Sequence, residues 1–142
     1  MATVVFDANA FIAFLSDEPG ADSVQQALLD CQSGEHAGIV HALNLYEVER
    51  WVRVNRPATV GVILKMLQSV LRAHCVRTAR HVSLRMQNQM IALKMAAGSN
   101  FSALDAACVA TAVTIDAYLL TSDHSEMDVL ERAGLAKFLW FR

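Results

Sequence analysis

At 142 residues and a formal net charge of −2, the sequence is 54% apolar and 18% charged, which suffices for one hydrophobic core and excludes a disordered chain. The N-terminus lacks a basic region, and the apolar runs break well before the ~20 residues that span a bilayer, so we expect a soluble cytoplasmic protein that crosses no membrane. Three cysteines without a Cys-x-x-Cys pair exclude a disulfide framework and a zinc knuckle and favour a reducing compartment; Cys75 and Cys108, in apolar runs, are expected to be buried.

The first part of the sequence predicts short apolar strands that alternate with helices. Residues 3–6 are β-branched and aromatic and predict a strand, and residues 8–16 have helical apolar spacing. Pro19 and Gly20 end this helix. The elements that follow are a helix at 21–32 ending near Gly34, a strand at 37–42, and a helix at 45–54 with Asn44 as its cap.

The second part of the sequence continues the same alternation. It predicts helices at 58–73, 82–97, 102–115 and 126–134, with strands at 74–79, 116–122 and 136–142; residues 98–100 stop the second of these helices, and Ser102 caps the third. Short buried strands separated by helices are typical of a parallel sheet covered on both faces. We therefore predict an α/β fold with a central parallel β-sheet flanked by α-helices, in a single domain over residues 1–142.

Four acidic residues that are far apart in sequence lie beside predicted segment boundaries. Asp7 and Asp123 follow strands, and Glu47 and Asp105 lie in the first turns of helices. Ligands of open α/β sheets collect beyond the carboxyl ends of the strands, so the fold can gather these side chains. Two carboxylates about 4 Å apart repel by roughly 4 kcal/mol at an effective dielectric near 20. A hard divalent cation, Mg²⁺ or Mn²⁺, relieves this repulsion and acts on phosphate oxygens.

Each of these acids also has a purely structural interpretation. Asn44-x-x-Glu47 fits a capping box, Ser102-x-x-Asp105 fits a variant of one, and Asp7 and Asp123 can each satisfy amides at the start of a helix. A residue at a helix start can serve as cap and as metal ligand together.

Several polar neighbours are candidates for supporting roles. Asn9 and Thr121 can orient the carboxylates or hold a water ligand of the cation, or can be ordinary turn and cap residues. The sequence leaves the roles of Glu126, Asp128 and His124 open, and it does not distinguish one metal ion from two.

The basic residues are concentrated in one part of the chain. From Arg50 to Leu104 there are nine Lys or Arg residues and no Asp or Glu, whereas the rest holds all fourteen acids and three bases. This portion can face a nucleic acid or an acidic partner, with Arg50 and Arg53 as candidate contacts, or it can be a solvated surface with a lopsided charge. Arg50 lies one helical turn beyond Glu47, so a local ion pair is an alternative to a substrate contact.

Four segments of the sequence form a set of motifs: DANAFIAFLSDEPGA at the start, N-x-x-E within NLYEVERW, LDAACVATA in the middle, and LLTSD near the end. Together they resemble the PIN-domain family, specifically the VapC-type toxins of toxin-antitoxin systems. The likeness covers the whole chain, with the four segments in the family's order. It implies a PIN fold whose acidic pocket contains Asp7, Glu47, Asp105 and Asp123.

The resemblance also implies an activity and partners. The activity is metal-dependent cleavage of RNA, with Asp7, Asp105 and Asp123 holding Mg²⁺ or Mn²⁺ and Glu47 binding a metal or helping to deprotonate the attacking water. The implied partners are an RNA substrate, a second copy of the chain in a homodimer, and a cognate antitoxin protein that blocks the pocket.

Two alternatives belong to other functional classes. The first is a catalytically inactive PIN-like module that binds RNA or a protein through the Arg50 to Lys94 surface. The second is a phosphohydrolase of the haloacid-dehalogenase type, which also begins with an apolar strand ending in Asp. That chemistry usually needs a second Asp two positions later, where this sequence has Asn9.

Overall fold

The computed structural model describes residues 1–98 and 100–142, and it has one parallel β-sheet at its centre. The described strands have the order β3-β2-β1-β4-β5, so β1 lies in the middle between β2 and β4. Their bounds are Ala2–Phe6 for β1, His36–His41 for β2, Arg77–Ala79 for β3, Tyr118–Thr121 for β4, and Lys137–Trp140 for β5. The predicted α/β class with a central parallel sheet is confirmed.

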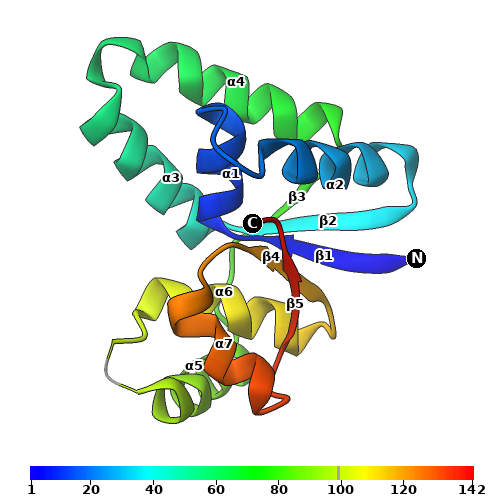
Figure 1. Ribbon diagram of the computed structural model, residues 1–142, viewed down its shortest axis with the longest axis vertical. Helices are drawn as coiled ribbons and strands as arrows, with labels where there is room; N and C mark the ends of the chain where they lie inside the picture. Colours follow the sequence, from blue (N-terminus) through cyan, green and yellow to red (C-terminus); the bar gives the residue numbers. More distant parts are fainter. Residues whose placement is uncertain (99) are drawn as a thin grey trace.

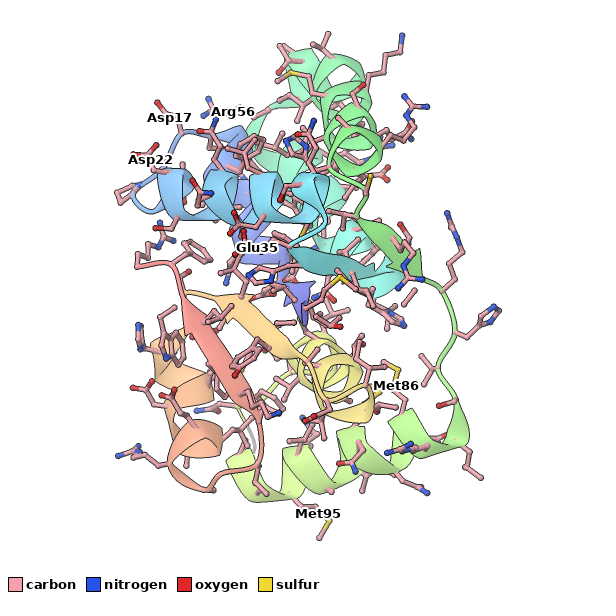
Figure 2. All side chains as sticks on the ribbon, turned by 90° about the vertical axis from the view of Figure 1, so that its right-hand side faces the viewer. Asp17, Asp22, Glu35, Arg56, Met86 and Met95 are labelled. Carbon is pink, nitrogen blue, oxygen red and sulfur yellow. The ribbon has the colours of Figure 1, made fainter. Side chains whose placement is uncertain are left out.

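Helices cover both faces of this sheet. Helices α1 to α4 lie on one side and α5 to α7 on the other (Figure 1), and the view turned by 90° shows the same two layers (Figure 2). None of the helices in the described parts of the chain combines the length and the hydrophobicity needed to cross a membrane. The helix bounds are α1 Ala8–Leu15, α2 Ala21–Ser33, α3 Ala42–Asn55, α4 Val60–Ala73, α5 Leu84–Ala97, α6 Ala103–Thr114 and α7 His124–Arg132, with a 3₁₀ turn η1 at Pro57–Thr59.

Strand β1 joins two separate parts of the hydrophobic core. Val4 and Phe6 face the core beneath α1 to α4, whereas Val5 faces the core beneath α5 to α7. This is the two-residue alternation of a strand that is buried on both faces. All three side chains are at most 1% exposed, so the residue that follows, Asp7, starts from a rigid position.

Helix α5 is only partly covered. Met86 is buried against the rest of the molecule, whereas Met95 is 81% exposed and points away from it (Figure 2). Leu84 and Ile91 on the same helix are also exposed. One set of apolar side chains on this helix therefore packs inward, while a second set faces outward.

Two boundary predictions differ from the structure around residue 75. The predicted strand at 74–79 is shorter, because Cys75 has a φ of +56° and the turn it forms delays β3 to Arg77–Ala79. Cys75 is exposed in this turn, so its predicted burial is wrong, whereas Cys108 is buried as predicted. Helix α5 ends at Ala97 with Gly98 as its cap, and position 99 of the predicted stop lies outside the described residues.

The predicted cap at Asn44 is also wrong. Helix α3 begins at Ala42, and the side chain of His41 caps it by accepting a hydrogen bond from the backbone N–H of Leu43 at 3.2 Å. The buried strand β2 passes into α3 at His41 without an intervening loop, so the imidazole takes the position of the capping acceptor. Asn44 is left inside the first turn of the helix with a different environment.

Candidate functional site

Asp7 lies at the carboxyl edge of the sheet, directly after β1. Its side chain is 3% exposed, and the hydroxyl of Thr121, the last residue of β4, donates a 2.7 Å hydrogen bond to its Oδ2. Burial raises the pKa of Asp7 to about 7; the hydrogen bond from Thr121 opposes this rise, and the charges of Asp105 and Glu47 add to it. The Asp7 carboxyl is therefore partly protonated near neutral pH, and other acids lie close enough to influence it.

Asp105 takes part in the helix cap predicted for α6. The Ser102 hydroxyl accepts a hydrogen bond from the Asp105 backbone N–H at 3.0 Å, and the Ser102 N–H donates to Asp105 Oδ2 at 3.3 Å. This capping box confirms the structural interpretation of Asp105. It also fixes the carboxylate at the N-terminus of α6, where the helix dipole favours negative charge.

Asp123 and Glu126 come from the start of α7. Asp123 is the N-cap residue, and its Oδ1 accepts a 2.8 Å hydrogen bond from Ser125, while its backbone N–H donates to Thr121 Oγ1. One oxygen atom each from Asp105, Asp123 and Glu126 lies within 4.8 Å of the other two. Glu126, whose role the sequence left open, is thus placed beside two of the predicted site residues.

Glu47 approaches the same group from α3. Burial raises the pKa of this half-buried side chain, the charges of Asp105 and Asp123 raise it further, and the charge of Arg50 lowers it. The close approach of the Asp105 carboxylate is the main cause that raises the pKa of Glu126 to about 7, and partial burial and the charge of Asp123 add to it.

Asp105 lies at the centre of this arrangement, because its charge acts on Asp7, Glu47 and Glu126 alike. The structure therefore brings Asp105, Asp123 and Glu126 within 4.8 Å of one another and places Asp7 and Glu47 within electrostatic range of Asp105. We call this group the carboxylate cluster, and it consists of Asp7, Glu47, Asp105, Asp123 and Glu126.

His124 and Asp128 lie apart from this cluster. The Nδ1 of His124 pairs with Asp128 Oδ1 at 3.0 Å, and its Nε2 lies 3.0 Å from the backbone carbonyl of Arg142. The imidazole also stacks on Trp140, with 3.9 Å between ring centroids. Although His124 is adjacent to Asp123 in sequence, its ring is held by the C-terminal segment.

The other predicted site residues, Arg50, Arg53 and Asn9, differ in where they lie relative to the carboxylate cluster. Arg50 is exposed and close enough to lower the pKa of Glu47, so it lies at the border of the carboxylate cluster. Arg53 instead forms an ion pair with Glu49 at 2.6 Å on the surface of α3. Asn9 lies in the first turn of α1, partly exposed.

Asn44 is the polar residue whose position sequence reasoning missed. Its side chain is 1% exposed, and neither Oδ1 nor Nδ2 forms a hydrogen bond within the described structure. Asn44 lies three positions before Glu47, which puts the two side chains on the same side of α3. The sequence shows this spacing, but there it fits a capping box at Asn44. In the structure His41 is the cap instead.

The chemistry of the cluster suits a hard divalent cation. Two full charges 4.8 Å apart repel by about 3.5 kcal/mol at an effective dielectric near 20, and protonation or a cation relieves this. The donors are carboxylate oxygens, which Mg²⁺ and Mn²⁺ prefer. The buried, unpartnered carboxamide of Asn44 adds a polar group whose hydrogen bonds a hydrated ion can complete.

The family model described as PIN domain matches residues 4–132. The chain belongs to the PIN-domain family. The predicted family is thereby confirmed, and the extension of one domain over all of residues 1–142 stays a prediction. No curated protein sequence matches this PIN domain.

Solved structures of low sequence identity share this PIN fold. VapBC2 from Rickettsia felis bound to a DNA fragment from its promoter matches with a TM-score of 0.73 at 14% identity, over 97% of this chain and 98% of that chain. A toxin-antitoxin complex from Klebsiella pneumoniae gives 0.67 at 18% identity, over 98% of both chains. VapBC-1 from nontypeable Haemophilus influenzae gives 0.69 at 12% identity, also over 98% of both chains. At these identities the likeness shows the fold.

Proposed function

We propose that this PIN domain is an endoribonuclease that depends on Mg²⁺ or Mn²⁺ and is the toxin of a toxin-antitoxin pair. The observation that carries the proposal is the carboxylate cluster, in which Asp105 lies within electrostatic reach of Asp7, Glu47 and Glu126. A cluster of this composition binds a hard cation, and such cations act on phosphate oxygens.

The residues of the cluster divide into two roles. Asp7, Asp105, Asp123 and Glu126 would hold the cation, with Thr121 orienting Asp7 through its hydrogen bond and Asn9 as a further polar neighbour. When bound, the cation lowers the pKa of a water ligand and neutralises charge that develops on the phosphate.

Glu47 has a different environment from the other acids. It is half-buried and its pKa is raised, so it is a suitable acceptor for the proton of the attacking water, or a further ligand. Hydrolysis by in-line attack of water would leave a phosphate on one RNA product and a hydroxyl on the other.

Arg50 is the better of the two candidate RNA contacts. It is exposed beside Glu47, so it can meet a phosphate that approaches the carboxylate cluster. Arg53 is engaged by Glu49, and a substrate contact there requires this surface pair to open. The acid-free portion from Arg50 to Leu104 supplies further positive charge for a polyanion.

The proposed protein partners are a cognate antitoxin and a second copy of the chain. In support, the similar solved structures named above include VapBC and toxin-antitoxin complexes. Exposed apolar side chains on α5, among them Leu84 and Met95, provide surface that partners commonly cover. Light scattering that gives one 15.6 kDa chain at working concentration contradicts the homodimer.

The cleavage assay uses purified protein and total cellular RNA with Mg²⁺, with Mn²⁺ or with a chelator. We expect cleavage with either metal and none with the chelator, and we expect Asp105→Asn to abolish it. Asparagine keeps the cap acceptor at the start of α6, so circular dichroism of this variant should be unchanged.

The matched control is Asp116→Asn. Asp116 is an exposed residue that pairs with Lys137 at 2.6 Å, outside the carboxylate cluster, and its φ of +55° is one that asparagine tolerates. This variant should cut RNA as the wild type does. Undiminished cleavage by Asp105→Asn would refute the proposed function, and salt-sensitive RNA binding without cleavage under any metal would favour the inactive binding module.

A further inference from the structure

Asn44 is a buried residue in the first turn of α3, a helix that packs against α6. It shares a side of α3 with Glu47, three positions away. On α6, Cys108 lies three positions after Asp105 and is fully buried. Burial is the main cause of the raised pKa of the Cys108 thiol, the charges of Asp7 and Asp105 add to it, and the nearby Asn44 side chain lowers it. Asn44 and Cys108 therefore lie together on the inner side of the acids.

This carboxamide has two donors and an acceptor that the surrounding protein does not satisfy. Neither its Oδ1 nor its Nδ2 forms a hydrogen bond of ordinary geometry in the described structure, and the neighbouring thiol of Cys108 is a weak partner at best. A buried polar group without partners destabilises a fold, and an apolar side chain of similar shape avoids that penalty. Packing alone therefore does not account for an asparagine at this position.

Two kinds of nearby group can complete these hydrogen bonds: the oxygens of the carboxylate cluster, and the water ligands of a cation bound there. The acids repel one another, and a bound cation draws their oxygens toward one point and brings its own water ligands. A carboxamide can donate to a carboxylate oxygen and accept from a water, so it matches both kinds of group. Partners of metal ligands commonly have this role, and their removal weakens metal binding by about 10–100-fold.

We infer that Asn44 is a positioning residue of the carboxylate cluster, whose carboxamide gains its hydrogen bonds from the carboxylates and water ligands of a bound divalent cation. The inference rests on the proposed function, since it takes the cluster to bind such a cation. It adds a neutral, fully buried group of α3 to a site otherwise made of acids. Asn44 thus acts through its neighbours and does not touch the RNA.

The test measures Mn²⁺ affinity by isothermal titration calorimetry, and stability by urea unfolding in a chelator, for the wild type, Asn44→Leu and Asn44→Ala. We expect both variants to bind Mn²⁺ about 10–100-fold more weakly. In the chelator, Asn44→Leu should be as stable as the wild type or more stable, because it removes an unsatisfied polar group. A residue that only supports the fold would give the opposite result in the chelator.

The control is Thr111→Val, which removes a buried hydroxyl from α6 whose 2.7 Å hydrogen bond goes to the Ala107 carbonyl. It should leave Mn²⁺ affinity unchanged. Unchanged affinity in Asn44→Leu and Asn44→Ala, or a loss of metal-free stability in both, would overturn the inference and assign Asn44 to packing. A wild-type protein that does not bind Mn²⁺ would instead count against the proposed function, so the two failures are distinguishable.

Discussion

The hydroxyl of Thr121 donates a 2.7 Å hydrogen bond to Oδ2 of Asp7, and so connects the ends of two paired strands across 114 positions of sequence. Thr121 is fully buried, and Asp7 is 3% exposed. The same hydroxyl accepts a hydrogen bond from the backbone N–H of Asp123 at 3.3 Å. One threonine thus links two acids of the carboxylate cluster.

Replacement of Thr121 by valine should destabilise the metal-free protein more at high pH than at low pH. Near pH 8 Asp7 is ionised, and a hydrogen bond to a charged group contributes about 1.5–3 kcal/mol. Near pH 5 Asp7 is protonated, since its pKa is about 7, and a hydrogen bond between neutral groups contributes about 1 kcal/mol. Urea unfolding in a chelator measures both losses.

Thr111→Val provides the matched control for this comparison. Its hydroxyl donates to a backbone carbonyl of the same helix, so its contribution involves no ionisable partner. Its effect should be equal at the two pH values. A Thr121→Val effect that is also independent of pH would contradict the assigned role of the Asp7 carboxylate.

The metal-free protein should lose stability as the pH rises from about 4 to about 7. The pKa of Asp7 is about 7 in the fold and 3.8 without it, so over this range the folded state holds a proton that the unfolded state has lost. Each unit of difference corresponds to about 1.4 kcal/mol, so we expect a fall on the order of 2–3 kcal/mol between about pH 5 and pH 8. The raised pKa values of Glu47 and Glu126 act in the same direction.

Asp7→Asn isolates the contribution of Asp7 to this dependence. Asparagine cannot ionise and still offers an acceptor to Thr121, so the fall in stability with pH should become much smaller. Asp116→Asn, at an exposed pair with Lys137, should retain the wild-type dependence. Urea midpoints in a chelator at several pH values provide the measurement, and a dependence unaltered in Asp7→Asn would show that another group is responsible.

Asp7 and Asp105 could be located from sequence because a local signal fixes each of them. The apolar run of β1 ends at Asp7, and the Ser102 cap fixes the start of α6 and hence the orientation of Asp105. Parallel strands then bring their carboxyl ends to one edge, so a correct order of elements is enough to gather the acids.

Glu126 and Asn44 could not be assigned in this way, because their positions depend on helix starts that the sequence obscures. Helix α7 begins at His124, two residues before the predicted start, so Glu126 lies within the first turn of the helix and not at its first position. At Asn44 the local pattern fits a cap, yet the buried His41 takes that role, with its Nε2 beside the distant His81 carbonyl at 3.3 Å. His41 is the last residue of a strand, and the sequence around it shows no pattern typical of a helix cap.

Glu126 and Asp128 offer a direct comparison of two acids on α7. Glu126 belongs to the carboxylate cluster, whereas Asp128 pairs with His124. Glu126→Gln should therefore weaken Mn²⁺ binding by at least roughly 10–100-fold, the loss typical even of groups that only support a metal ligand, and Asp128→Asn should leave it unchanged. Calorimetric titration of both variants checks this. Equal Mn²⁺ affinities of the two variants would mean that Glu126 is a surface acid without a role in metal binding.

Gly20 and Gly34 test how the C-terminal segment is held near the site. Both glycines have a left-handed backbone, with φ of +91° and +82°, which disfavours alanine at each by about 1–2 kcal/mol. A Cβ on Gly20 would lie 2.4 Å from the carbonyl oxygen of Phe141, whereas a Cβ on Gly34 would meet nothing within 4 Å. Gly20→Ala thus adds a steric clash to the backbone effect that the two variants share.

We expect Gly34→Ala to show the backbone effect alone and Gly20→Ala to lose a further 1–3 kcal/mol or so, the usual scale of overpacking. The backbone N–H of Phe141 donates to the Thr121 carbonyl at 3.3 Å. If Phe141 moves to relieve the clash, it therefore pulls on the end of β4, where Thr121 lies. Urea unfolding of the two variants gives the difference. Equal losses of unfolding free energy in the two variants would mean that the C-terminal residues move at little cost and do not stabilise the end of β4 beside Asp7.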